Sequence, residues 1–122
     1  MLVMRLRPVD ELGVEEILAR AGSNEAAILA AETDTFVMAA HYADLHSPES
    51  RPQQGPSLPG MEKARRFGGP GTPAMWEYAI VHLALALGVS TAAVRYLIAD
   101  ALDTRHRLPS LWARVRAGEV RV

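Results

Sequence analysis

The segment 86–95, ALGVSTAAVR, carries the signals that end one helix and begin another. Gly88 can adopt the left-handed backbone conformation that commonly follows a helix, and the hydroxyl of Ser90 can cap the helix that comes next. Two helices joined by so short a turn are typical of the helix-turn-helix motif of DNA-binding proteins. The segment therefore predicts a helix-turn-helix-like hairpin over about residues 74–104.

The residue types around the turn satisfy the packing needs of such a hairpin. Ala84 and Val94 can lie where the two helices touch, with Gly88 in the turn between them. Further apolar side chains are spaced to complete the contact, namely Leu83, Leu87, Val89 and Leu97. Because any two helices with a short turn have similar needs, this pattern predicts the hairpin and leaves its function open.

The outward surface of the second helix would carry Thr91, Ala92, Arg95, Tyr96 and Ala99. Arg95 can read guanine, and Thr91 can contact a phosphate. Asp100 and Asp103 would repel the DNA backbone unless they turn away, whereas the basic residues beyond them would attract it. The candidate nucleic-acid-binding residues are therefore Thr91, Arg95, Arg105, Arg107, Arg114 and Arg116.

The segments on either side of the hairpin predict how it is covered. A threonine followed by a proline at the start of 72–88 predicts a helix that begins there. Its surface is apolar nearly all round apart from Glu77 and His82, which indicates a helix buried on several sides with His82 in the core. The segment 109–118 predicts a last amphipathic helix with Leu111, Trp112 and Val115 on its apolar side. We expect Trp76 and Trp112 to be largely buried.

The first half of the chain predicts two further helices. Asp10 can cap a short helix that Gly22 ends, and Ser23 can cap a longer one that runs to about His46. The apolar residues of the longer helix recur at alternating spacings of three and four, which places them on one side. They are Ala26, Leu29, Thr33, Phe36, Ala40 and Ala43.

Helical periodicity disappears in the middle of the chain. Six of the eight prolines and five of the nine glycines lie between Pro48 and Pro73, which predicts a long loop over 48–72. This loop contains a basic patch of Lys63, Arg65 and Arg66. We therefore expect one all-α domain over residues 1–122, with about five helices in two groups, 9–47 and 73–118, on either side of the loop.

Charge is distributed unevenly along the chain. Residues 9–49 contain nine acidic side chains against Arg20 alone, a net charge of −8, and residues 92–122 contain six arginines against three acids, a net charge of +3. The basic half could contact a polyanion, or the two halves could face each other within the fold. In the second case Arg95 would pair with Glu32 or Asp34.

Composition excludes several classes of protein. With 122 residues and no cysteine, the chain fits one domain without disulfides or a thiolate zinc site. It contains no apolar run of membrane-spanning length and no signal-peptide pattern, so we expect a cytoplasmic location. His41 and His46 are five residues apart and lie on different sides of a helix, which does not suit joint metal binding. We expect no catalytic residues, no metal, no cofactor and no small-molecule substrate.

Several motifs in the second half resemble one bacterial family. GGPGTP at 68–73, LIADALD at 97–103, RHRLP at 105–109 and LWARVRAGEV at 111–120 are similar to the domain-of-unknown-function family 222 of high-GC bacteria, also called the 13E12 repeat family. HYADLH at 41–46 looks like the helix before the variable loop of that family. The resemblance covers about residues 26–120.

The resemblance implies a helical domain of the kind that commonly precedes an HNH endonuclease domain. It assigns no function to the helical part itself, and no residues here match the histidines and asparagine of an HNH site. We therefore expect a non-catalytic packing or interaction module, or a truncated copy of a longer nuclease-associated protein. The alternative is an accessory DNA-binding domain. Candidate partners are DNA, a second copy of the chain and a separately encoded HNH domain.

Overall fold

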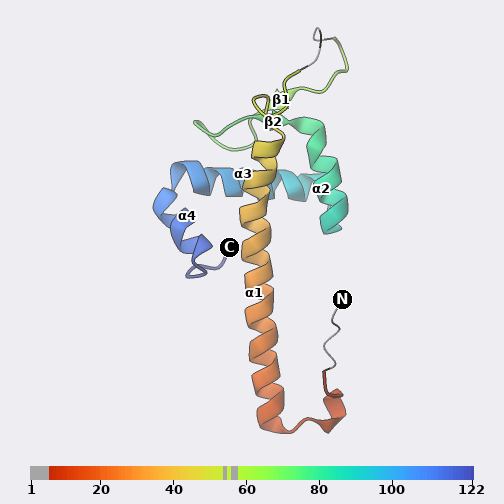
Figure 1. The fold of residues 1–122 in the computed structure, drawn as a ribbon, viewed down its shortest axis with the longest axis vertical. Helices are drawn as coiled ribbons and strands as arrows, with labels where there is room; N and C mark the ends of the chain where they lie inside the picture. The colour runs from red at the N-terminus through yellow and green to blue at the C-terminus, as the bar shows by residue number, and fades with distance from the viewer. Residues whose placement is uncertain (1–5, 54, 56–57) are drawn as a thin grey trace.

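The computed structural model describes residues 6–53, 55 and 58–122, and its elements are mostly helical (Figure 1). The described chain has four α-helices, two short 3-10 turns and one two-stranded hairpin. In chain order they are η1 (Val9–Glu11), α1 (Val14–Leu45), β1 (Ala64–Arg65), β2 (Met75–Trp76), η2 (Glu77–Ala79), α2 (Ile80–Leu87), α3 (Thr91–Arg107) and α4 (Pro109–Arg116). The all-α prediction is confirmed, with four helices in place of five.

The two helices predicted before the loop form one continuous helix. α1 passes through Gly22 and Ser23 without a break, so the predicted end and cap at these positions are wrong. A glycine inside a helix costs only about 1 kcal/mol, and the neighbouring alanines and glutamates are good helix formers. The helix begins instead after Gly13, whose N–H donates to the Glu16 carboxylate over 3.4 Å, while Asp10 lies in η1.

The segment predicted as the start of the next helix is extended. Met75 and Trp76 form β2, which pairs antiparallel with β1 so that Ala64 lies opposite Trp76. The Trp76 backbone N–H donates to the carbonyl of His46 over 2.8 Å, and its indole N–H donates to the carbonyl of Arg51 over 2.6 Å. These tertiary contacts hold the segment extended, so α2 starts only at Ile80 and the predicted start at Pro73 is wrong.

The predicted hairpin is present. Gly88 ends α2 in the left-handed conformation with φ 67°, and the Ser90 hydroxyl accepts the N–H of Ala93 over 3.1 Å at the start of α3. The segment Glu77–Leu87 meets α3 at a bend of 106°, within the range of helix-turn-helix pairs. No single helix of the described chain is both long and apolar enough to cross a membrane, although these two segments pass that test together across the bend.

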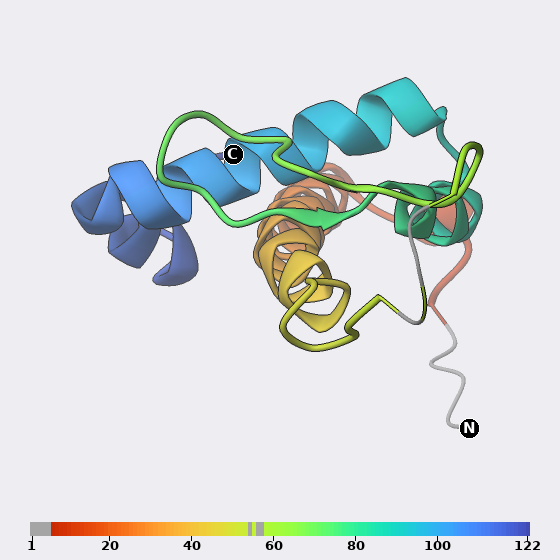
Figure 2. The ribbon, with the colours of Figure 1, turned by 90° about the horizontal axis from the view of Figure 1, so that it is seen from above.

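The core lies where α3 crosses α1 (Figure 2). Four buried side chains of α3 face four of α1, which are Val94, Ile98, Ala101 and Leu102 on α3 and Phe36, Ala39, Ala40 and Ala43 on α1. Trp112 of α4 is half-buried, with its ring centre 6.0 Å from that of Phe36, whereas Trp76 is buried, with 6% exposed. His82 is exposed, because only one side of α2 packs on the core, so its predicted core position is wrong.

The first half of α1 projects away from this core (Figure 1). The chain before it folds back beside the helix base, where the Arg7 side chain pairs with Glu16 and the Arg20 guanidinium donates to the Arg7 carbonyl over 2.9 Å. Most side chains in this part of α1 are exposed.

Candidate nucleic-acid interface

The first half of α3 presents one side to solvent, as the sequence predicts. Thr91, Ala92, Arg95 and Tyr96 are exposed, Tyr96 at 73%, and Ala99 is half-buried. The buried residues of α3 lie on the side toward α1, so this exposed side faces away from the core. In the view of Figure 2, α3 lies across one side of α1 with the segment before β2 beside it.

A second element completes this surface, and the sequence analysis did not connect it with the hairpin. Arg65, Arg66 and Phe67, at the end of β1 and just after it, line the same shallow hollow as Ala92, Arg95, Tyr96 and Ala99, with a volume of about 380 Å³. We call these seven residues the basic face. The Arg95 guanidinium lies 5.6 Å from the centre of the Phe67 ring, close enough for a cation–π contact.

Strand pairing positions Arg65 and the adjacent Arg66 of the basic face. β1 pairs with β2, and the N–H of Glu77 donates to the carbonyl of Lys63 over 3.0 Å. The Arg65 side chain then donates to the Glu77 carboxylate over 2.5 Å. This hydrogen bond, together with the positive charges of Arg65 and Arg95, lowers the pKa of Glu77. Because Glu77 offsets the charge of Arg65, the basic face owes its positive charge mainly to Arg66 and Arg95.

The two acids of α3 that would repel DNA do not line the hollow of the basic face. Asp103 accepts the N–H of Gly69 over 2.6 Å, and its carboxylate lies 3.6 Å from the Arg107 guanidinium. This close approach of the chain to Asp103 requires glycine at position 68, because a Cβ there would lie 2.8 Å from the Thr72 side chain and 3.0 Å from the Asp103 carboxylate. Asp100 lines a different hollow. Asp103 therefore ties the glycine-rich segment to α3 beside the basic face.

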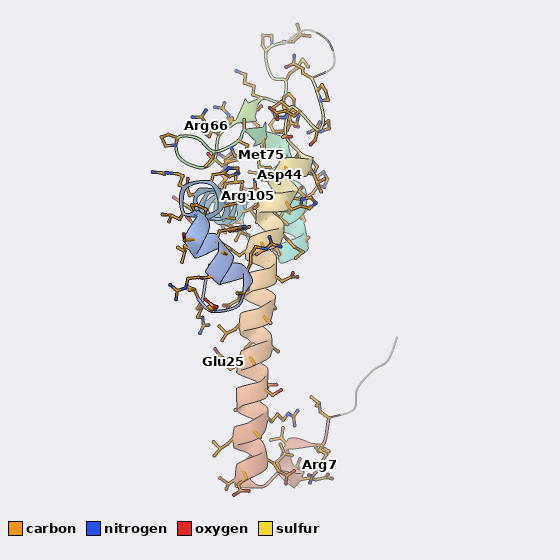
Figure 3. The ribbon with its side chains drawn as sticks, turned by 60° about the vertical axis from the view of Figure 1, so that its left-hand side comes forward. Arg7, Glu25, Asp44, Arg66, Met75 and Arg105 are labelled. Carbon is orange, nitrogen blue, oxygen red and sulfur yellow. The ribbon has the colours of Figure 1, made fainter. Side chains whose placement is uncertain are left out.

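The other predicted contact residues do not join Thr91 and Arg95. Arg105 forms two hydrogen bonds of 2.7 Å with Asp44 of α1 and is only 21% exposed (Figure 3). Arg107 lies near Asp103, and Arg114 lies 3.4 Å from Glu119. Arg116 lines a hollow between α4 and α1. The predicted set is thus spread over several surfaces, and Arg105 connects α3 to α1.

Part of the charge asymmetry is resolved inside the fold. Besides the pair of Arg105 with Asp44, the Arg121 guanidinium lies 3.2 Å from Glu25 and 3.6 Å from Glu32. The predicted pairing of Arg95 with Glu32 or Asp34 is wrong, because the C-terminal segment brings Arg121 to Glu32 and Arg95 lies over Phe67 instead.

The histidines form no site with other ligands. Within the described part of the chain, no group of three or more histidine, aspartate or glutamate side chains could hold a metal ion. His41 is exposed. His46 is half-buried, its Nδ1 has no hydrogen-bond partner among the described residues, and burial is the main cause that lowers its pKa.

Comparison of the chain with family models, with curated proteins and with solved structures found no match. The resemblance to the domain-of-unknown-function family 222 therefore stays a prediction.

Proposed function

We propose that this chain is a non-catalytic helical domain that binds double-stranded DNA through the basic face. The observation that supports this most is that Arg66 and Arg95, 29 positions apart in the sequence, line one hollow beside the exposed side of α3. This helix is the second of a hairpin whose angle of 106° is typical of helix-turn-helix pairs. Double-stranded DNA is the polyanion that such a helix fits, because the major groove admits an α-helix.

Three residues of the basic face, together with the neighbouring Thr91, would have definite roles. With the first half of α3 in the major groove, Arg95 would reach a guanine edge, and Thr91 and Arg66 would contact phosphates on either side. Phe67 restricts the Arg95 side chain before DNA arrives, which reduces the entropy lost on binding. Arg105 would act indirectly, since its pair with Asp44 holds α3 across α1.

The resemblance to the nuclease-associated family supports the same class of partner. In that family the helical domain commonly precedes an HNH endonuclease domain, for which DNA is the substrate. A domain that binds DNA without cleaving it would serve a nuclease module encoded in the same or a separate chain.

A salt titration of a labelled duplex by fluorescence anisotropy tests the proposal. Each lost phosphate contact should reduce the slope of log K against log[salt] by about 0.9, so Arg66→Ala should flatten the slope by about that amount. Arg95→Ala should weaken binding and relax the preference at one base pair. Arg114→Ala is the matched control, because Arg114 is an exposed arginine outside the basic face.

Two results would overturn the proposal. One is no binding of the wild-type protein at about 50 mM salt, where non-specific contacts are strong. The other is an equal loss of affinity in Arg66→Ala and Arg114→Ala, which would mean that charge alone, and not this surface, attracts the DNA.

A helical interaction module is the second candidate function, and the projecting half of α1 favours it. This segment exposes apolar side chains that a globular domain normally buries, which is typical of a surface that binds another protein.

A further inference from the structure

The projecting half of α1 lacks the packing that a helix of this kind needs. Leu18 is 67% exposed, and Ala19, Gly22, Ala26 and Ala30, which share its side of the helix by periodicity, are exposed as well. An isolated helix of this length is only marginally stable in water, and an apolar side is normally packed against another element. Gly22 weakens the segment further. We therefore expect the exposed side of this segment to be buried by binding another chain.

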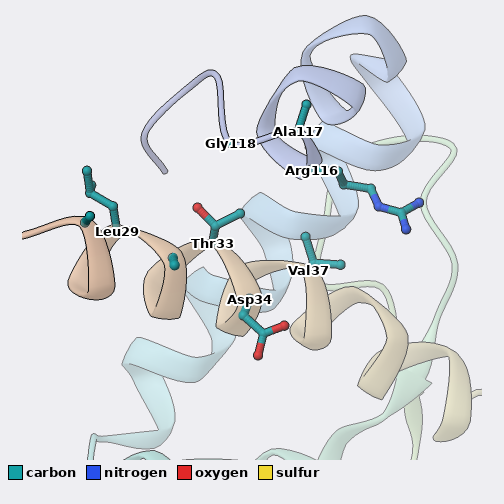
Figure 4. A pocket seen from close by; sticks show the side chains of 9 residues that line it. Leu29, Thr33, Asp34, Val37, Arg116, Ala117 and Gly118 are labelled. Carbon is teal, nitrogen blue, oxygen red and sulfur yellow. The ribbon is translucent and has the colours of Figure 1, made fainter. Parts of the chain in front are cut away.

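A hollow of about 610 Å³ lies where this segment meets the rest of the fold (Figure 4). Its floor on α1 is formed mostly by small or apolar residues, together with the polar Thr33 and Asp34, and the end of α4 at Arg116–Gly118 closes it on one side. The small and apolar residues are Ala26, Leu29, Ala30 and Val37. Leu29, Thr33 and Val37 point from α1 toward the end of α4.

The same side of α1 continues from the hollow to the helix tip and is complementary to itself. Helical periodicity places Leu18, Ala19 and Gly22 in line with the floor of the hollow. If two copies of α1 pair antiparallel about residue 24, each large side chain meets a small one. The facing positions are then Ala19 with Leu29, Gly22 with Ala26, and Leu18 with Ala30.

Charges along this side agree with the same arrangement. Antiparallel pairing places Glu15 of one copy opposite Thr33 of the other, next to the end of α4 that carries Arg116. Asp34 also lines the hollow, but within the described residues Arg116 has no ion pair, whereas Arg121 already binds Glu25 and Glu32. Glu15 of one copy would therefore lie near Arg116 of the other copy, which has no ion pair within its own fold.

We infer that the chain forms a two-fold symmetric homodimer in which the tip of each α1 lies antiparallel in the hollow of the other copy. Such an interface uses the same surface on both copies, as two-fold dimers do, and covers the exposed Leu18 on each. The inference is independent of DNA binding, because the basic face is formed by α3 and the segment after β1.

Sedimentation equilibrium at tens of micromolar tests the assembly. The wild-type chain should have twice its monomer mass of 13.3 kDa. Ala26→Glu should return the mass to that of the monomer, because it places a charge in the apolar interface. Ala27→Glu is the matched control, since it makes the same change on the next exposed residue, outside the hollow, and should leave the dimer intact. A monomeric wild type, or equal dissociation in both variants, would overturn the inference.

Disulfide cross-linking tests the relative direction of the two helices. Because the chain contains no cysteine, only the introduced cysteines can form a disulfide. Ala19→Cys protein mixed with Leu29→Cys protein should give a cross-linked pair under mild oxidation, and neither protein alone should do so. Cross-linking of the Ala19→Cys protein with itself would indicate parallel helices and overturn the antiparallel arrangement. A monomer that still binds DNA would contradict the dimer and leave the basic face as proposed.

Discussion

Replacing Arg105 by methionine separates a structural role from a DNA contact. The sequence places Arg105 among the DNA-binding arginines, whereas in the structure its guanidinium makes two hydrogen bonds of 2.7 Å to Asp44 and links α3 to α1. Methionine keeps much of the length and apolar contact of the side chain and removes its charge. We therefore expect Arg105→Met to destabilise the fold without a direct loss of DNA contacts.

The size of the effect follows from the geometry of the pair. Hydrogen bonds between charged groups contribute about 1.5–3 kcal/mol each when shielded, but the Asp44 side chain is 42% exposed, so solvent reduces the value of the whole pair to about 1–2 kcal/mol. For a chain of this size such a loss lowers the melting temperature by about 3–8 °C. Arg114→Met should change stability by less than about 0.5 kcal/mol, because Arg114 and Glu119 are both mostly exposed.

Urea unfolding and DNA titration of the same proteins provide the assay. A double-mutant cycle with Asp44→Asn should show a coupling energy of about 1 kcal/mol between the two positions. The affinity of Arg105→Met for a duplex, measured well below its melting temperature, should stay within about twofold of wild type, against a clear loss for Arg95→Ala. Unchanged stability with a large loss of affinity would refute the reasoning and return Arg105 to the DNA contacts.

Three further predictions concern the core, the pH dependence and the chemistry of the chain. Leu102→Ala should destabilise by about 3–5 kcal/mol in urea unfolding, because Leu102 is fully buried, and Trp112→Ala should cost less, since Trp112 is half-buried; the reverse order would contradict this packing. Because the folded state lowers the pKa of His46 below its ordinary 6.5, the unfolded chain takes up the proton first, so stability should fall as pH drops below about 6.5. In urea titrations at pH 7.5 and 5.5, His46→Gln should lose less unfolding free energy between the two pH values than wild type does. An equal loss in both proteins would show that other groups cause the pH dependence. Purified protein with magnesium, manganese or zinc should not nick plasmid DNA, and nicking that persists through repurification and is lost in a His41 or His46 variant would show an active site.

The structural features that the sequence determined by itself are local ones. A glycine followed two residues later by a serine is enough to end α2 and begin α3, and Pro109 is enough to begin α4, because these caps act on backbone groups within one helical turn. Helical periodicity likewise predicted that Phe36, Ala40 and Ala43 share the buried side of α1. Gly22 shows the limit of such signals, since a glycine ends a helix only where the flanking residues also favour an end.

Only the tertiary structure decided which residues form the candidate interface. Met75 and Trp76 are extended because β1 and the carbonyls of His46 and Arg51 bind them. The pairing of β2 with β1 also places Arg66, which follows β1, in the same hollow as Arg95. The same holds for the arginines, which are alike in sequence: Arg105 is paired because α3 crosses α1 at Asp44, whereas Arg95 lies over Phe67. Electrostatic partners are chosen by distance in space, and that distance is set by the packing of segments far apart in the chain.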